Sequence, residues 1–142
     1  MTRPSRHVTM LSVAAVLATR STCSRRQVGC VLTDKYGRIL ATGHNGVPMS
    51  MPHCTDSPCP GSGLPSGTGL DTCGAVHAET NALMFCPDIM KIETCYVTAS
   101  PCVACCKSLL NSSCQRIIFL EEYPHPEARE LWTKAGRKWL KL

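Results

Sequence analysis

Residues 93–120 read ETCYVTAS-PCVACCKSLL-NSSCQRIIFL, and the architecture of the chain can be worked out from them. The first segment, Glu93–Ala99, and the last, Arg116–Leu120, are rich in β-branched and aliphatic side chains, so each predicts a strand. Between them, Cys102–Ser112 predicts a helix with an apolar stripe. Because a helix that joins two strands favours a right-handed crossover, we expect the two strands to be parallel.

The flanking sequence continues this alternation in both directions. The further elements expected are a helix at Arg6–Thr19, strands at Val28–Asp34 and Arg38–Thr42, a helix at His77–Phe85, a helix at Pro126–Ala135 and a strand at Arg137–Leu142. A long loop rich in glycine and proline covers residues 43–73. With neither repeats nor a linker, this order predicts one α/β domain over residues 1–142, a mixed sheet of five strands covered by helices, with the last three strands parallel.

Composition excludes several classes of protein. With 44% hydrophobic and 18% charged residues in 142, the chain is not disordered. No run approaches the roughly 18 apolar residues of a membrane helix, so we expect no membrane partner. The basic N-terminus precedes Val8–Ala18 without a cleavage site, which favours an uncleaved cytoplasmic protein. The net charge of +5 suits an anionic ligand or a solvated basic surface, and it does not separate the two.

Cysteine is the unusual component, with eleven residues of this type. A reducing cytoplasm makes a disulfide framework improbable, and an odd number excludes complete pairing within the chain. Metal ligation and buried thiols are therefore the two explanations that we carry forward.

Two short motifs contain residues suited to chemistry at a metal ion. Cys102 and Cys105, three residues apart on the opening turn of a helix, lie on one face and can chelate one ion. With His77 as third ligand, the fourth tetrahedral position of Zn²⁺ stays open, as in catalytic sites. His77 and Glu79 can face one site only if His77 is at the very start of its helix.

Each signal alone is weak, because a lone histidine is more often a satisfied polar residue and one C-x-x-C is also typical of structural zinc or a redox pair. The combination of His77-x-Glu79 with Pro101-Cys102-x-x-Cys105 is the signature of zinc nucleobase deaminases. It predicts attack of a zinc-bound hydroxide on the carbon of a nucleobase that carries the amino group, with Glu79 as the proton shuttle.

At this point the sequence resembles a known family, the deoxycytidylate (dCMP) deaminases of bacteria and phages within the cytidine deaminase superfamily. The residues that carry the resemblance are Thr22–Gly29, Gly43–Gly46, His53-Cys54, His77–Ala82, Val97–Cys102 and Leu120–Tyr123. The resemblance implies a three-layer α/β/α sandwich and the hydrolysis of dCMP to dUMP and ammonia, which supplies dUMP for thymidylate synthesis. It also implies a homo-oligomer, commonly a hexamer, with dCTP and dTTP as effectors and Mg²⁺ accompanying a nucleotide effector.

The resemblance further assigns contacts to the substrate. It implies that the N–H of Ala78 and the carbonyl of Ser100 hold the base edge and that Asn45 binds the sugar. A residue such as Asn45 could equally be a turn residue with positive φ.

For the phosphate of the substrate we expect Arg26, although adjacent arginines are often only solvated. Tyr123 either stacks on the base or closes the pocket, or it only packs. Three positions depart from the family: His44 stands where tyrosine is usual, Pro124 stands where some relatives have a basic residue after the tyrosine, and Thr80 replaces the usual leucine or methionine beside Glu79.

A second zinc site is expected in the long loop. Four thiolates would form a closed structural site that clips residues 53–73 to the start of the first strand. The expected ligands are Cys23, Cys54, Cys59 and Cys73. Relatives with cysteine at the positions of Cys23 and Cys54 carry such an ion. His53 is the substitute ligand if Cys59 or Cys73 does not reach.

Three alternatives to dCMP deamination remain. The substrate could be another cytosine nucleotide, such as dCTP or a 5-substituted dCMP. A deaminase of tRNA adenosine, guanine or single-stranded DNA would require a basic channel or stacking aromatics, which the sequence lacks. A non-enzymatic zinc module that binds nucleic acid would have no use for the unliganded carboxylate of Glu79, so we expect no nucleic-acid partner.

Overall fold

Five strands form one mixed sheet, in the order β2-β1-β3-β4-β5, in the computed structural model of the protein, which describes residues 2–65, 68 and 74–142. The strands are β1 (Gly29–Thr33), β2 (Ile39–His44), β3 (Thr94–Ala99), β4 (Arg116–Glu121) and β5 (Lys138–Lys141). β1 is antiparallel to β2 and to β3, whereas β3, β4 and β5 run parallel. The mixed sheet and its parallel half are therefore confirmed.

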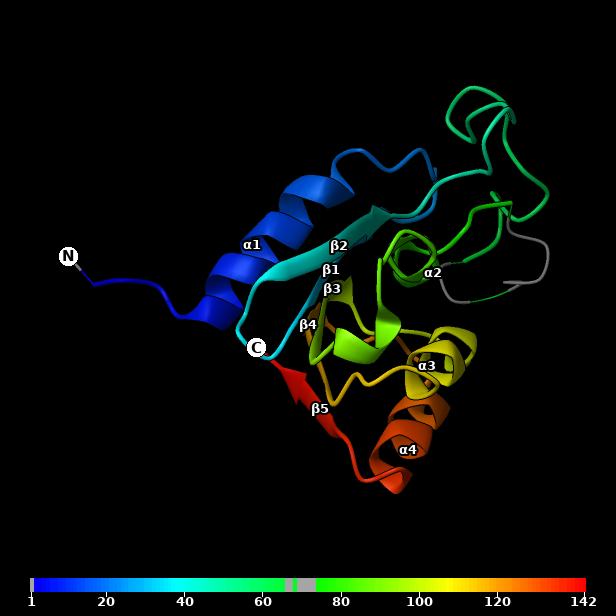
Figure 1. Ribbon diagram of the computed structural model, residues 1–142. Helices are drawn as coiled ribbons and strands as arrows, with labels where there is room; N and C mark the ends of the chain where they lie inside the picture. Colours follow the sequence, from blue (N-terminus) through cyan, green and yellow to red (C-terminus); the bar gives the residue numbers. More distant parts are fainter. Residues whose placement is uncertain (1, 66–67, 69–73) are drawn as a thin grey trace.

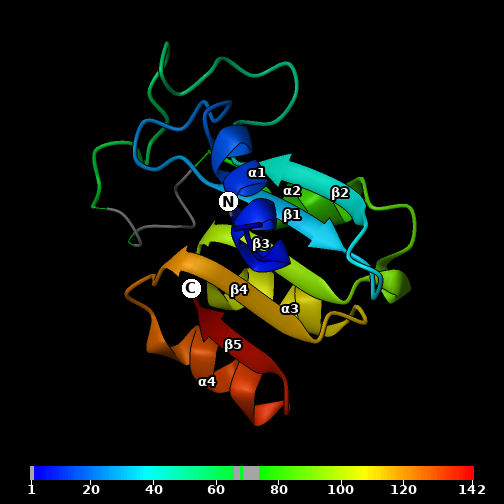
Figure 2. The ribbon, with the colours of Figure 1, turned by 90° about the vertical axis from the view of Figure 1, so that its left-hand side faces the viewer.

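The helices cover both faces of this sheet. They are α1 (Arg6–Ala18), α2 (Ala78–Met84), α3 (Val103–Leu110) and α4 (Pro126–Lys134), with a short 3₁₀ turn η2 at Ile89–Lys91 that the sequence did not predict. Figure 1 shows α1 on one side of the sheet and α2, α3 and α4 on the other. In Figure 2, viewed from the α1 side, that helix lies in front of the strands. The three-layer α/β/α sandwich is confirmed.

Each face of the sheet has its own hydrophobic core. On the α1 face, Leu11 and Ala14 pack against Val31, Tyr96 and Ile118. The larger core lies on the other face and includes Leu32, Val97, Ile117, Phe119, Leu109 and Trp132. Because successive residues of a strand point to opposite faces, Ile117 and Ile118 belong to different cores.

Two glycines allow helices to approach the sheet closely. A Cβ on Gly29 would overlap the carbonyl of Ala14 in α1, and a Cβ on Gly43 would overlap the carbonyl of Ala78 in α2. A larger residue at either position would push the helix away from its strand. The start of α2 is thus held directly against β2.

The long loop leaves the domain and returns at almost the same point. Gly46 and Val76 exchange two backbone hydrogen bonds, with N···O distances of 3.1 and 2.7 Å. Gly46 and Val76 therefore close the loop of residues 47–75 at its base. Because Val76 is held in this bridge, the next residue, His77, begins at a fixed position. In the part of the chain that the structure describes, no helix is long and apolar enough to cross a membrane.

Candidate active site

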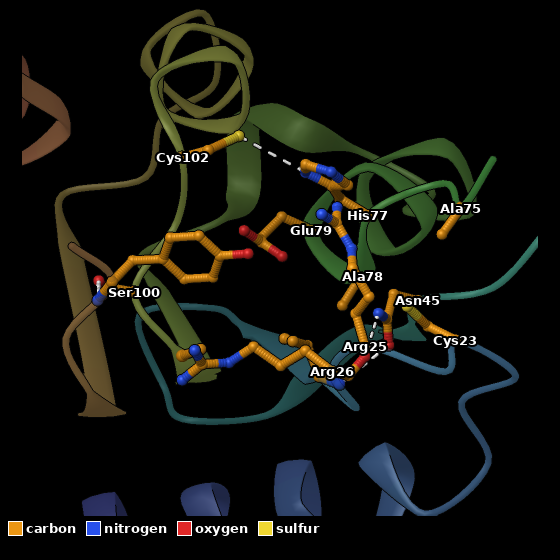
Figure 3. A pocket seen from close by; sticks show the side chains of 13 residues that line it. Cys23, Arg25, Arg26, Asn45, Ala75, His77, Ala78, Glu79, Ser100 and Cys102 are labelled. Carbon is orange, nitrogen blue, oxygen red and sulfur yellow. Dashed lines mark hydrogen bonds between the residues drawn. The ribbon is translucent and has the colours of Figure 1, made fainter. Parts of the chain in front are cut away.

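The first turn of α2 positions His77 and Glu79. His77 is the N-cap, with φ −69° and ψ 152°, so its backbone is extended. Two residues at i and i+2 within a helix point about 200° apart around its axis, but His77 lies before the first helical residue. Its side chain and that of Glu79 can therefore face the same site. Both side chains line one cleft, shown in Figure 3. The expectation that His77 begins the helix is confirmed.

The first turn of α3 brings Cys102 and Cys105 to the same place. Cys102 is the N-cap of α3, and Cys105 lies in its first turn. The Nδ1 atom of His77 is 3.3 Å from Sγ of Cys105 and 3.5 Å from Sγ of Cys102. A tetrahedral zinc ion with ordinary bond lengths separates its nitrogen and sulfur ligands by about 3.6 Å, so the three atoms fit this ion.

The protonation of these groups follows from their mutual contacts. The thiol of Cys105 and then the ring of His77 hydrogen-bond to Cys102 and lower its pKa to about 4. The same contact with Cys102, together with burial, raises the pKa of Cys105, and the hydrogen bond with Cys102 raises the pKa of His77. Hydrogen bonding within the cluster thus favours at Cys102 the thiolate form that a metal ligand requires.

Glu79 lies beside this cluster without belonging to it. The cluster of His77, Cys102 and Cys105 is the one potential metal site found among the described residues. The side chain of Glu79 is 4% exposed, and burial raises its pKa to about 7. A carboxyl group with such a pKa can hold or release a proton near neutral pH, as a general acid and base must. Three protein ligands beside an unliganded carboxylate are the donor set of a zinc-dependent hydrolase.

The residues expected to contact the base border the same cleft. Ala78 is the first residue of α2, and an N–H in the first turn has no partner within its helix. Ser100 is 2% exposed; its N–H donates to the carbonyl of Glu121 over 2.8 Å, and its hydroxyl accepts from the N–H of Tyr123 over 2.6 Å. These two bonds fix the turn that follows β3.

Asn45 lines the cleft and braces the loop in front of β1. Its side-chain oxygen accepts from the N–H of Val28 over 2.9 Å, and its amide nitrogen donates to the carbonyl of Arg26 over 2.7 Å. Among the described residues, Ser50 is the one non-glycine residue with positive φ, so the alternative of Asn45 as a turn residue of that kind is wrong. Its side chain instead sets the backbone that carries Arg26.

Arg26 and Tyr123 meet at the mouth of the cleft. The Arg26 guanidinium carbon lies 4.9 Å from the centre of the Tyr123 ring, and Nη2 lies 2.5 Å from the carboxylate of Glu121. Arg26 is therefore not simply solvated, and Tyr123 lines the cleft beneath a cation. Whether either side chain contacts a substrate stays a prediction.

Sequence reasoning missed four residues of the cleft, namely Arg25, Val28, Ala75 and Ala99. Arg25 is the most informative of them, because its Nη1 donates to the carbonyls of Leu64, Pro65 and Thr68 over 3.4, 3.1 and 2.7 Å. It links the long loop to the cleft. The Arg25-Arg26 pair was the available signal, but only Arg26 was singled out.

The expected ligands of a structural zinc ion are brought together only in part. The Sγ atoms of Cys54 and Cys59 are 3.7 Å apart, and the N–H of Cys59 is the main cause that lowers the pKa of Cys54, to about 7. Cys23 does not join them in a three-ligand cluster among the described residues and lines the catalytic cleft instead. Cys73 lies outside the described residues. The assignment of Cys23 to this group gains no support from the structure.

Four of the five remaining thiols are buried inside the fold, and the fifth, Cys86, is half-buried and packs against the larger core. Cys30 and Cys95 are fully buried with their Sγ atoms 3.7 Å apart, and Cys106 and Cys114 are fully buried as well. Burial raises the pKa of Cys106 and of Cys114, so both stay neutral and behave as small hydrophobic side chains.

Comparison with known proteins agrees with this site. Residues 4–121 match the family model of the cytidine and deoxycytidylate deaminase zinc-binding region. The chain is 37% identical to a deoxycytidylate deaminase of Mycobacterium phage D29 over 129 residues, which cover 86% of this chain and 99% of the phage protein. It is 31% identical to a deoxycytidylate deaminase of Saccharomyces cerevisiae, with 85% of this chain covered and 39% of the yeast protein. The chain belongs to the cytidine and deoxycytidylate deaminase family.

Solved structures agree on the fold. The dCMP deaminase of cyanophage S-TIM5, crystallised with dCMP and dUMP, superposes with a TM-score of 0.78 at 22% identity over the whole of both chains. A bifunctional deaminase and reductase of Thermotoga maritima superposes with a TM-score of 0.67 at 20% identity and covers 96% of this chain and 36% of the other. At these identities the likeness establishes the sandwich alone.

Proposed function

We propose that this protein hydrolyses dCMP to dUMP and ammonia. The observation that carries the proposal is the convergence of two helix N-termini, which places His77, Cys102 and Cys105 around one point and buries Glu79 beside it. Relatives named deoxycytidylate deaminase support dCMP as the substrate. Production of dUMP for thymidylate synthesis is the metabolic role that follows.

The reaction divides between the metal and the chain. Zinc held by the three ligands would polarise a water molecule and make it a nucleophile toward C4 of the cytosine. Glu79 would accept one proton of this water and transfer it to ring N3 as the water oxygen bonds to C4. It would then move the second proton of the water to the amino group, after which the C4–N bond breaks and ammonia leaves. The N–H of Ala78 and the carbonyl of Ser100 orient the base, and Asn45 faces the sugar.

We assign the phosphate of the substrate to the arginine pair. Arg26 lies at the mouth of the cleft, and Arg25 lines the same cleft from the adjacent position. Guanidinium groups bind phosphate oxygens in a bidentate manner, which a neutral side chain cannot do. Arg26→Ala is therefore expected to raise the KM for dCMP, with kcat changed much less.

The test is ammonia release from a panel of cytosine compounds by the zinc-loaded protein. dCMP is expected to give the highest kcat/KM, with deoxycytidine, dCTP and 5-methyl-dCMP behind it. Faster turnover of dCTP or of the 5-methyl compound would mean that this nucleotide is the substrate, while the deamination reaction itself would stay the same. An absence of ammonia from every cytosine compound would refute the proposal.

A second, structural zinc ion in the loop is part of the proposal. The sulfur atoms of Cys54 and Cys59, 3.7 Å apart, match the edge of a tetrahedral site. A Cβ on Gly74 would lie 3.0 Å from Cβ of Cys59, and Cys73 directly precedes that glycine in the sequence. The proposed ligands are Cys23, Cys54, Cys59 and Cys73, with His53 as the substitute if Cys59 or Cys73 does not reach the ion. Metal analysis with a single zinc ion per chain would contradict this site.

Assembly and regulation are proposed on the resemblance to the family. We infer a cytoplasmic homo-oligomer, a hexamer in the form usual for these relatives, with dCTP and dTTP as effectors and Mg²⁺ accompanying a nucleotide effector. Met84, Phe85 and Met90 are 69%, 67% and 63% exposed, which favours self-association over a monomer. Sedimentation with and without dCTP–Mg²⁺ tests both points, and a monomer indifferent to nucleotides would contradict them.

A further inference from the structure

The side chain of Arg26 crosses the open end of the cleft. Arg26 precedes β1, and Glu121 ends β4, while β3 lies between these two strands in the sheet. The Arg26–Glu121 ion pair therefore spans the carboxyl end of β3, where the chain continues to Ser100 and the metal ligand Cys102. Figure 3 shows the extended side chain of Arg26 along one side of the cleft, opposite Cys102 and His77.

We propose that Glu121 sets the selectivity for a phosphorylated substrate by competing with the substrate phosphate for the Arg26 guanidinium. This inference rests on the proposed function, specifically on Arg26 as a phosphate ligand. Glu121 would then be a specificity-determining residue that itself never contacts the base or the reacting atoms. Neither the deaminase motifs nor the resemblance to the family includes it in the substrate site.

The exposure of the two side chains makes the exchange feasible. The side chain of Glu121 is 74% exposed, whereas that of Arg26 is 24% exposed. An ion pair with a partner so accessible to water contributes little to stability, because water screens the attraction. A phosphate monoester carries more charge than a carboxylate and offers more oxygens to the guanidinium, so it can replace Glu121.

Other contacts keep Arg26 in place during the exchange. Its backbone carbonyl accepts from the Asn45 amide over 2.7 Å, and its guanidinium carbon lies 4.9 Å from the Tyr123 ring centre. The N–H of Tyr123 is in turn bonded to the Ser100 hydroxyl over 2.6 Å. Because these contacts do not involve Glu121, the cation stays at the mouth of the cleft when the carboxylate is replaced.

The consequence is a preference that depends on the charge of the ligand. A neutral nucleoside cannot displace the carboxylate of Glu121, so the pair stays closed across its binding site. A nucleoside monophosphate opens the pair at a cost equal to the strength of the Arg26–Glu121 contact. Removing the negative charge at position 121 removes that cost for the phosphorylated ligand alone.

The experiment compares Glu121→Gln with wild type in three measurements: KM and kcat for dCMP, the same constants for deoxycytidine, and the calorimetric Kd for dUMP. We expect KM for dCMP and Kd for dUMP to fall about two- to fivefold. This fold-change corresponds to the free energy of one exposed ion pair, which the phosphate no longer has to break. The kcat for dCMP and the constants for deoxycytidine should stay unchanged. Inorganic phosphate should also become a better competitor.

Glu122→Gln is the matched control, because it removes a neighbouring carboxylate that accepts from the Trp139 indole N–H over 2.9 Å and does not line the cleft. It should leave every constant at the wild-type value. A higher KM for dCMP in Glu121→Gln would mean that Glu121 only holds Arg26 in position, and equal changes for dCMP and deoxycytidine would exclude phosphate selectivity. If Arg26→Ala leaves the KM for dCMP unchanged, the phosphate assignment itself fails.

Discussion

The catalytic cleft and the loop of residues 47–75 are built in opposite ways. In the cleft, each ligand lies in the N-terminal turn of a helix whose position is set by packing on the sheet, and this packing brings His77, Cys102 and Cys105 together. The loop has turns but no helix or strand within its described residues, and it is held by a bridge at its base and by Arg25.

The difference teaches where a metal ion is needed for structure. Secondary structure already orders the catalytic ligands, so zinc adds chemistry there more than order. The loop has few apolar side chains to bury, and a metal ion is a source of order that such a segment lacks. Perturbations of the cleft should therefore change turnover, and perturbations of the loop should change stability.

The largest expected effect is on turnover at the cleft. Glu79→Gln keeps the size of the side chain but removes the proton acceptor, so kcat for dCMP should fall by about 10²–10⁴-fold. The catalytic zinc should stay bound, because Glu79 is not one of its ligands. Steady-state kinetics with metal analysis checks both points, and a variant that retains near wild-type kcat would show that Glu79 is not the proton shuttle.

The next effect concerns the loop. Cys59→Ser should lose the zinc ion that we propose for the loop and lower the thermal midpoint, while kcat falls far less than in Glu79→Gln. Differential scanning calorimetry and metal analysis measure these changes. Cys86→Ser is the control, since it removes a half-buried thiol outside both sites and should retain all bound zinc. Loss of activity with unchanged metal content in Cys59→Ser would contradict the separation between cleft and loop.

A smaller effect is expected where α2 rests on the sheet. In Gly43→Ala the new Cβ would overlap the carbonyl of Ala78 and come within 2.7 Å of the Ala82 nitrogen, so α2 has to move. Such overpacking costs about 1–3 kcal/mol of unfolding free energy. Because α2 carries Glu79, kcat should decline as well. Chemical denaturation combined with kinetics tests this, and wild-type values in both would mean that the position of α2 is not critical.

The smallest effect is expected at a glycine of the loop. A Cβ on Gly63 meets nothing within 4 Å, and the described glycines with positive φ are Gly37 and Gly136. Gly63→Ala should therefore be neutral or stabilise the protein by up to about 1 kcal/mol, because alanine lowers the conformational entropy of the unfolded chain. Chemical denaturation would show it, and a marked loss of stability would indicate that the loop is as tightly packed as the cleft.

The parts that the sequence predicted are those fixed by local pattern. Strand and helix periodicity predicted the elements and the parallel half of the sheet, and the spacing of His77, Glu79, Cys102 and Cys105 predicted the metal cluster. The contacts of Arg25 and Arg26 depend on how distant segments meet, because Leu64, Pro65, Thr68 and Glu121 come beside them only in the folded chain. The place of Cys23 in the lining of the cleft could not be predicted from the sequence for the same reason.

The most direct test of the central claim is the reaction of the zinc-loaded protein with dCMP in water enriched in ¹⁸O. Attack of water at C4 predicts dUMP that carries one solvent oxygen at this carbon, with ammonia released in equal amount. A dUMP product without the solvent label, or no conversion of dCMP by protein that holds its zinc, would contradict the account.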